Sequence, residues 1–445
     1  MTRILKRTLF ILLTIAILFS FAGCSLQLPE LFSKPTPTPV PTPEPTPEPT
    51  PTPTPKPYAD GFDICGRHYP IDAVEIDLSG ISSDADISLF AAVAPWAEKL
   101  TTVHLGSEST TPVSWNVISR LQAAAPNVRF DYAFSLYGEP MTLDTEYIDL
   151  RKIPVNDNAE AVVAALPCMK KCTYLDMDDC GVPSERMAQI RDMFPNVKVV
   201  WRVWFSTLDY SVRTDVKTVL ASLTGEGPYC GITNEESAIP LTYCTDVINL
   251  DLGHNNNMRT LSFIRYMPNL EVFITYNNFL RDVDDLAYAK HLKYLELYGS
   301  SMYDIKALAD LNELTDLLIC FCYNLEDISP IIPADKVTSL RRLWLTPDII
   351  PQEQIDAFQA NHPNCIVNTT DNSTDWFWRS DTPMEGGGYT PQYQETLDIF
   401  HYRADNLEGF SFSKNDPYYT AGHGQPIDMA RAAWFYSDVH YSPYS

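Results

Sequence analysis

The sequence predicts an α/β solenoid with a curved parallel sheet, and three observations support this. An apolar phrase (apolar, two variable residues, apolar, variable, apolar) begins at Val247, Leu270, Leu292, Leu314 and Leu340, with spacings of 23, 22, 22 and 26 residues. Residues 69–78 align with 141–150 at an offset of 72 residues, which indicates a longer duplication upstream. Helix-period segments separate the upstream strand phrases. A fixed period in this range is typical of units that stack to bury their apolar sides.

The upstream half predicts helices on the outer, convex side of the sheet. Apolar residues recur every three or four positions over 86–100, 114–125, 160–169 and 184–194. Residues 128–134 and 197–205 alternate apolar and polar, so we expect them to be further strands of the same sheet. The irregular long repeats therefore cover residues 66–206.

Residues 207–245 interrupt this rhythm. They contain a Gly-Glu-Gly-Pro turn, and residues 214–223 predict a helix, so we interpret the segment as a connector. Regular repeats of about 22 residues follow over 246–369. Repeats this short have space only for a turn or a 3₁₀ piece on the convex side. The solenoid as a whole is predicted to span residues 58–369.

The strand phrase also predicts which side chains face outward. Its first, fourth and sixth residues point into the core, so the fifth residue faces solvent on the concave side. The fifth residues are Asp77, His104, Asp149, Asp176, Asp251, Ile274, Glu296, Leu318 and Trp344. Tyr276 and Tyr298 share the seventh position and should lie ~4.8 Å apart. The expected ligand-binding residues of this concave face are Asp251, Tyr276, Tyr294, Glu296, Tyr298, Phe321 and Trp344. The alternative is that the C-terminal tail folds back over them.

The first 23 residues predict an export signal. Arg3, Lys6 and Arg7 precede an apolar stretch, residues 9–21, that is too short for a comfortable membrane span. Small residues then precede Cys24, and this junction resembles the lipobox of bacterial lipoproteins. The resemblance implies acylation of Cys24 and an extracytoplasmic protein anchored by lipid to the outer face of the cell membrane. The alternative is an ordinary signal peptide with an incidental cysteine.

A proline-rich stalk follows the proposed anchor. Proline alternates with Thr, Val, Glu and Lys over residues 35–57, so this segment cannot join a helix or a sheet interior, and residues 24–57 are predicted to be the anchor cysteine with its stalk. A polyproline-II segment of this length would reach about 70 Å at ~3.1 Å per residue. A disordered tether without a set length is the alternative.

Charge and cysteine content exclude several classes of function. The formal net charge of −25 argues against a nucleic acid partner, which requires Lys and Arg for phosphate contacts. The ten cysteines lack the paired spacing of a zinc site, so we interpret those after Cys24 as buried structural thiols. Residues 176–179 lack the ligand spacing of a calcium loop. No metal or cofactor is therefore expected.

No catalytic signature is present either. The chain has no G-x-S-x-G elbow, phosphate loop or H-E-x-x-H motif, so no enzymatic role is expected. The tail, residues 370–445, is rich in aromatic residues, including Trp376, Phe377 and Trp378. It is either a packed extension that caps the solenoid, a small module with carbohydrate-stacking aromatics, or disordered.

Residues 247–345 resemble the internalin-like leucine-rich repeats of bacterial surface proteins. Asn255 and Asn278 occupy the ninth position of the repeat, and Ser300 and Cys322 replace asparagine later. The whole layout resembles leucine-rich-repeat lipoproteins that Gram-positive bacteria export. The resemblance implies non-catalytic recognition of a protein or glycan through the concave face of the solenoid. The alternatives are a surface enzyme with a hydrolytic module in residues 371–445, and an envelope scaffold without a soluble ligand.

Overall fold

The computed structural model describes residues 57–205, 210–221, 232, 234–253, 257–346, 349–369, 378 and 390–400. The signal segment, Cys24, most of the stalk and most of the aromatic tail lie outside the described residues. In the part that the structure describes, no helix is long and apolar enough to cross a membrane.

The first sheet has four strands in the order β3-β4-β5-β6, preceded by a small β1–β2 hairpin. The bounds are β1 Phe62–Ile64, β2 Arg67–Tyr69, β3 Glu75–Asp77, α2 Asp84–Val93, η1 Ala94–Trp96, β4 Thr102–Ser107, α3 Trp115–Ala124, β5 Arg129–Leu136 and β6 Glu139–Thr142. Strands β3 to β5 are parallel, and β6 returns antiparallel to β5. Helices α2 and α3 confirm the first two predicted helices.

The second sheet repeats the pattern with the parallel order β7-β8-β9. Its elements are β7 Tyr147–Asp149, α4 Glu160–Ala165, η2 Leu166–Cys168, β8 Tyr174–Asp176, α5 Ser184–Met193 and β9 Lys198–Val200. A hairpin of β10 Arg202–Phe205 and β11 Tyr210–Arg213 follows. The predicted third strand 197–205 is thus divided between β9, which joins this sheet, and β10, which does not.

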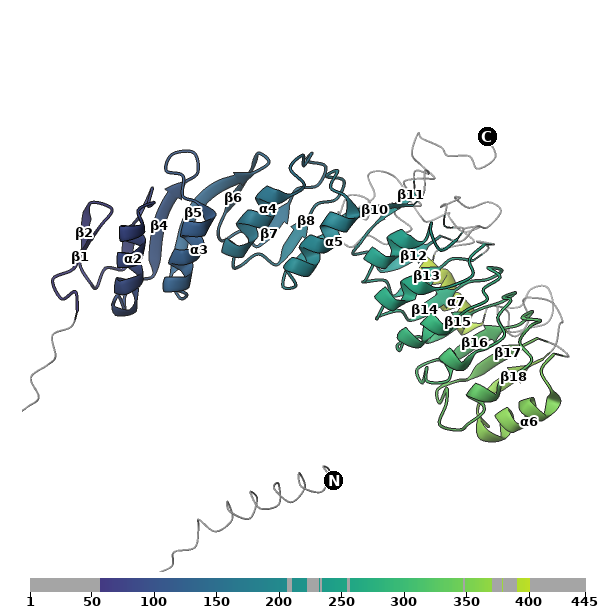
Figure 1. Cartoon of the computed structure of the whole chain (residues 1–445). Helices are drawn as coiled ribbons and strands as arrows, with labels where there is room; N and C mark the ends of the chain where they lie inside the picture. The colour runs from purple at the N-terminus through teal and green to yellow at the C-terminus, as the bar shows by residue number, and fades with distance from the viewer. Residues whose placement is uncertain are drawn as a thin grey trace, which may run out of the picture. The chain divides into compact units, whose positions relative to one another are not determined.

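The third sheet has seven parallel strands in chain order (Figure 1). They are β12 Thr218–Leu220, β13 Asn249–Asp251, β14 Val272–Ile274, β15 Tyr294–Glu296, β16 Asp316–Ile319, β17 Arg342–Leu345 and β18 Ile366–Asn368. The connections are η3 Ile239–Tyr243, η4 Ser262–Tyr266, η5 Asp284–Tyr288, η6 Lys306–Leu308, η7 Ser329–Ile331 and α6 Gln352–Asn361; α7 Pro391–Phe400 comes last. Leu250, Phe273, Leu295, Leu317 and Leu343 lie in direct register, which confirms a solenoid with short 3₁₀ connections.

Two predictions about the upstream half are wrong. The predicted helix 214–223 is described as far as residue 221, and there Thr218–Leu220 is a strand that pairs with β13 and begins the seven-stranded sheet. The predicted single sheet is instead divided into three. The first division has a local cause: Tyr137 and Gly138 adopt φ of 53° and 93°, the left-handed pair of a tight hairpin turn, so β6 pairs back onto β5.

The interior is a continuous apolar core. The inward residues of the repeats, such as Leu250, Phe273 and Leu295, are fully buried. Side chains at the ninth position hydrogen-bond the preceding repeat: Asn278 Nδ2 donates to Leu252 O at 2.8 Å, and Cys322 Sγ donates to Leu297 O at 3.3 Å. Eight cysteines of the described residues are free thiols, and all but Cys65 are buried.

Candidate binding surfaces

The concave side of the seven-stranded sheet is covered. We use the term strand face for its third and fifth repeat positions in β13 to β17. The exposed fractions there are 3% for Asp251, 5% for Tyr294, and 1% each for Glu296 and Trp344. The prediction that these four candidate ligand-binding residues face solvent is therefore wrong. The physical reason is that another segment of the chain packs on them.

That segment contains Trp378 and α7. Trp378 is fully buried, and its indole Nε1 donates a hydrogen bond of 2.7 Å to Glu296 Oε1. Its ring lies 4.3 Å from the Arg342 guanidinium and 5.5 Å from the Tyr294 ring. Tyr393, Thr396 and Phe400 of α7 are also buried. In Figure 1, α7 (yellow) lies against the strands, and it contacts β12.

Arg342 holds the main chain of the same segment. Its Nη1 donates to Trp378 O at 3.1 Å, and Thr390 Oγ1 donates to that oxygen at 2.8 Å. Arg342 also forms an ion pair with Asp316, its register partner on β16. Tyr294 OH donates to Glu296. Sequence reasoning missed Asp316 and Arg342, although two opposite charges at the third position of successive repeats signal such a pair.

Aromatic side chains form a row along the turns that follow β14, β15 and β16. We call Tyr276, Tyr298, Phe321 and Tyr323 the aromatic ladder. Tyr276 and Tyr298 stack in parallel with centroids 3.9 Å apart, Phe321 lies 4.9 Å from Tyr298, and Tyr323 lies 5.9 Å from Phe321. This confirms that Tyr276 and Tyr298 are neighbours. Tyr323 is 60% exposed, and the other three are partly buried.

The backbone at Phe321 is strained. The eighth repeat position is left-handed in three successive repeats, with φ of 58° at Asn277, 71° at Gly299 and 58° at Phe321. Asparagine and glycine accept this conformation, whereas a bulky aromatic residue pays about 1–2 kcal/mol. Phe321 therefore presents its ring at a cost to the fold, and strain of this kind gathers at functional sites.

The upstream polar face is made of paired charges. His104 Nδ1 lies 3.2 Å from Asp131 and its Nε2 lies 3.4 Å from Glu75. Hydrogen bonding to Asp131 is the main cause that raises the pKa of His104. A hydrogen bond from Ser79, with help from Arg67, lowers the pKa of Asp77 to about 2. Asp77, His104 and Asp149 remain partly exposed, as their fifth position predicts.

Asp176, by contrast, belongs to a buried ion network. Arg213 donates to Asp176 at 3.1 Å, to Asp215 at 3.1 Å and to Asp178 at 3.3 Å. Arg202 forms a second, bidentate pair with Asp178. This network fastens the β10–β11 hairpin to β8, so Asp176 has a structural role there.

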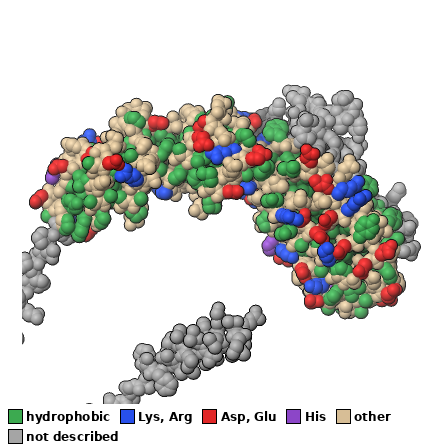
Figure 2. Space-filling view, in the orientation of Figure 1, with side chains coloured by type: hydrophobic (Ala, Val, Ile, Leu, Met, Phe, Trp, Pro, Cys, Tyr) green, Lys and Arg blue, Asp and Glu red, His purple; other side chains and the backbone are tan. Residues whose placement is uncertain are grey.

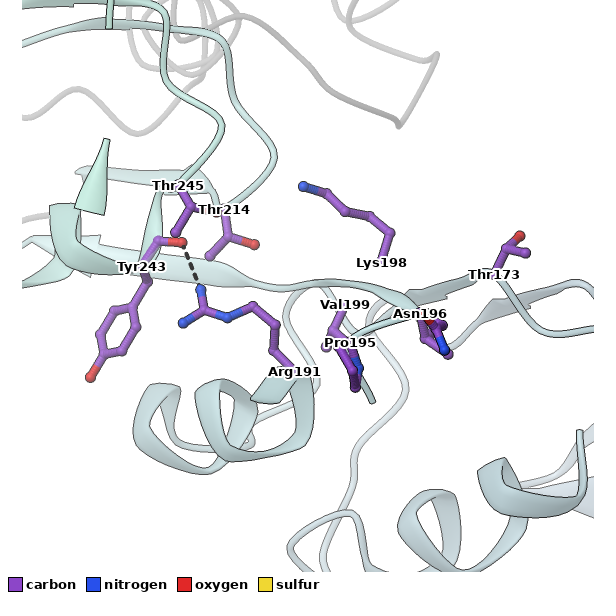
Figure 3. Close-up of a pocket in the computed structure, with 10 residues that line it drawn as sticks. Thr173, Arg191, Pro195, Asn196, Lys198, Val199, Thr214, Tyr243 and Thr245 are labelled. Carbon is purple, nitrogen blue, oxygen red and sulfur yellow. Dashed lines mark hydrogen bonds between the residues drawn. The ribbon is translucent and has the colours of Figure 1, made fainter. Parts of the chain in front are cut away.

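A polar pocket of about 340 Å³ lies where α5 and β9 meet the segment around η3 (Figure 3). Its lining residues are Thr173, Arg191, Pro195, Asn196, Val197, Lys198, Val199, Thr214, Tyr243 and Thr245. Arg191 reaches from α5 and donates to Tyr243 O at 3.4 Å. Lys198 is paired with Asp246 at 2.5 Å. Arg191 also lies 3.5 Å from Asp192, so both cations of the pocket are paired with carboxylates of this chain, which weakens their attraction for an anionic ligand.

Surface charge and metal-ligating groups point to no further site. Figure 2 shows acidic and basic side chains interspersed with hydrophobic ones on the face it presents. Within the described residues, no group of three His, Cys, Asp or Glu side chains is arranged to hold a metal ion.

The comparisons with known proteins give weak likenesses. No family model and no curated protein matches the chain. An internalin from Listeria monocytogenes is similar in structure at 15% identity, covering 69% of this chain and 86% of the internalin, with a TM-score of 0.29. The internalin C2 of that bacterium has 20% identity over 37% of this chain and 75% of its own, with a TM-score of 0.23. A leucine-rich-repeat protein of Leptospira interrogans has 14% identity over 67% and 96%, with a TM-score of 0.15. The assignment of a repeat solenoid therefore rests on the register and period of this chain's own strands.

Proposed function

We propose that the chain is a non-catalytic binding protein that recognises another protein through its aromatic ladder. The observation that carries this proposal is Phe321, an aromatic residue kept at a left-handed position where neighbouring repeats have Asn277 and Gly299. Exposed tyrosines on a rigid scaffold are common anchors of protein interfaces. Tyr303 and Phe279, 68% and 42% exposed, extend the apolar surface in the same repeats.

The stacking geometry favours a protein over a glycan. Sugars bind aromatic residues through the open face of a ring. Tyr276 and Tyr298 cover each other's faces at 3.9 Å with planes only 4° apart, and Phe321 lies on the next repeat beside Tyr298. Each of these two tyrosine rings therefore has one face covered by the other, which leaves less open ring face for a sugar and favours the mixed apolar and polar atoms of a protein surface. Burial and the Tyr276 hydrogen bond raise the pKa of Tyr298, so its phenol stays neutral.

We extend the proposal to location. Acylation at Cys24 would place the solenoid outside the cell, at the end of the proline stalk. Labelling of cells with an alkyne fatty acid tests this. The wild-type protein should carry the label, and Cys24→Ala should not. A labelled Cys24→Ala protein, or an unlabelled wild type, would contradict the anchor.

The substitution Phe321→Asn separates binding from folding. Asparagine suits φ of 58°, as Asn277 shows, so the variant should unfold at an equal or higher urea concentration. It also removes one ring of the ladder. Combined with Tyr323→Ala, it should weaken binding at least tenfold in an interferometry screen against purified extracellular proteins and glycans.

The matched control is Tyr288→Ala, on η5, because Tyr288 is 55% exposed and lies outside the ladder. Binding should survive this change. A photo-crosslinking residue at position 323 in intact cells should capture a protein, and the same residue at 288 should not. Ligand binding that is unaffected by Phe321→Asn with Tyr323→Ala would refute the proposal. If the wild-type protein binds a glycan in the screen and the variant does not, the ladder recognises a glycan and the proposal of a protein partner is wrong.

A further inference from the structure

We infer that the strand face is a second docking groove, specific for a polypeptide segment that presents a tryptophan, and that Trp378 with α7 is its internal, displaceable occupant. This surface is separate from the aromatic ladder, so the inference does not rest on the proposed function. It is argued from the composition of the face, from the contacts of its occupant and from the absence of strand pairing between that occupant and the sheet.

The composition of the face is unusual for permanent burial. The inward positions of the repeats are apolar except at Thr275. The covered outward positions mix apolar residues, among them Ile274, Leu318 and Trp344, with four charged ones. The charged residues are Asp251, Glu296, Asp316 and Arg342, which are exposed by 3%, 1%, 4% and 6%. Burying ionised groups costs several kcal/mol each before pairing offsets it. Apolar residues would hold a permanent cover better, so these charges fit a face that is open part of the time.

The occupant shows which chemistry the groove accepts. Glu296 takes the indole N–H at 2.7 Å, which selects tryptophan over phenylalanine. Arg342 lies over the indole ring at 4.3 Å and also donates to the carbonyl of the same residue at 3.1 Å. Glu296 of β15 and Arg342 of β17 thus bind both the side chain and the main-chain carbonyl of Trp378. Recognition of a backbone carbonyl and an indole describes a peptide ligand.

The occupant is attached without strand pairing. It adds no strand to the seven-stranded sheet, whose last member is β18. Within the described residues its regular structure is α7, a helix of 10 residues, whose stability comes from packing. Detachment would break side-chain contacts and the bond to Trp378 O but no strand pairing, so we expect this element to open before the sheet does.

An external segment would therefore compete with an internal one. The apparent association constant for the external segment is the intrinsic constant multiplied by the fraction of molecules in which the groove is open. Removing the Trp378 side chain should raise that affinity. The partner is a polypeptide with a tryptophan beside an apolar helical face.

The test uses the full chain and a labelled synthetic peptide of residues 374–400, measured by fluorescence anisotropy. Trp378→Ala protein should bind the peptide at least tenfold more tightly than wild-type protein does. A peptide with alanine in place of Trp378 should bind neither. Adding Glu296→Ala to the Trp378→Ala protein should abolish the gain. The matched control is Trp96→Ala, because Trp96 is 46% exposed and lies in η1, far along the chain.

Hydrogen exchange of the wild-type protein supplies a second readout that needs no variant. The amides of α7 should exchange at least 100-fold faster than those of β14 to β16. Addition of an excess of the peptide should leave the exchange of β14 to β16 slow. If α7 exchanges as slowly as those strands, or if a folded Trp378→Ala protein does not bind the peptide, the groove is a permanent part of the core and the inference fails.

Discussion

Ser300 is the residue at which the ladder of ninth-position hydrogen bonds is interrupted. Asn278 and Cys322, one repeat to either side, both donate to the preceding repeat. The Ser300 hydroxyl is buried and has no hydrogen-bond partner. Its side chain is too short to copy the asparagine bond. A buried polar group left in this state costs about 1–3 kcal/mol.

We predict that Ser300→Ala raises the free energy of unfolding by up to about 1 kcal/mol, because it removes the unpaired hydroxyl. Asn278→Ala should lower it by about 1–3 kcal/mol, because it leaves Leu252 O without its donor. Urea denaturation measures both. The control is Asn324→Ala, whose exposed side chain makes a similar bond of 3.2 Å to Ser301 O. A destabilised Ser300→Ala protein would show that the hydroxyl is satisfied.

His104 makes the upstream face sensitive to pH. Asp131 and Glu75 raise its pKa above the ordinary value of 6.5. A raised folded-state pKa means that the stabilising contribution is complete below the ordinary pKa and is lost as pH rises through the raised one. We expect an NMR titration of His104 to give a pKa above 6.5, and Asp131→Asn to bring it down. An unchanged titration in Asp131→Asn would exclude Asp131 as the cause.

At this scale the sequence predicts neighbours better than exposure. The seventh-position rule correctly predicted that Tyr276 and Tyr298 are neighbours, and the structure adds that their rings stack. It could not predict that Glu296 is buried, because nothing in the strand phrase indicates what lies on its outer side. The covering residue, Trp378, is 82 positions away from Glu296 along the chain. The left-handed backbone at Phe321 could not be predicted either, because phenylalanine does not favour this conformation as the equivalent Asn277 and Gly299 do.

The elements are joined by charges as well as by apolar packing. The β10–β11 hairpin adds no strand to either flanking sheet. It is held to β8 by Arg213, which is 4% exposed and bonds to Asp176, Asp178 and Asp215. A single buried cation thus balances three carboxylates, with Arg202 assisting at Asp178.

We predict that Arg213→Met lowers the free energy of unfolding by roughly 3–5 kcal/mol, because it leaves buried carboxylates without compensation. The control is Arg120→Met. Arg120 pairs with Asp84 at a site where the side chains are 44% and 87% exposed, so a loss below about 1 kcal/mol is expected. Guanidinium denaturation followed by circular dichroism measures both. Equal effects of the two substitutions would mean that the network contributes no more than a surface pair.

Helices and strands with a clear period were predictable, and those set by distant partners were not. The periods of α2, α3 and α5 identified them, and the strand phrases located β13 to β17. Residues 214–223 looked helical because Val216, Val219 and Leu220 are spaced like a helix face. Thr218–Leu220 instead forms a strand, because it pairs with β13. Tertiary contacts override local propensity when a segment can add a strand to a sheet.

On the scale of the whole molecule, one architectural rule holds from β12 to β18. Successive strands are neighbours, parallel and in register, as repeat stacking requires. Upstream, the same α/β unit is used in two smaller sheets. The candidate surfaces change with this picture: Trp378 covers the strand face in this structure, and Tyr298, Phe321 and Tyr323 lie on the turns that follow the strands.

The antiparallel return of β6 has a consequence for how such a chain can grow. A stack of parallel coils has no natural terminus, so every added coil must match the one before it. Because β6 pairs back onto β5, it occupies the edge of the first sheet at which the next parallel strand would otherwise pair. The coils after Thr142 therefore need not continue the strand register of β5, and they pack on the first block through side-chain contacts instead, such as the 2.8 Å bond from Gln122 Nε2 to Cys168 O.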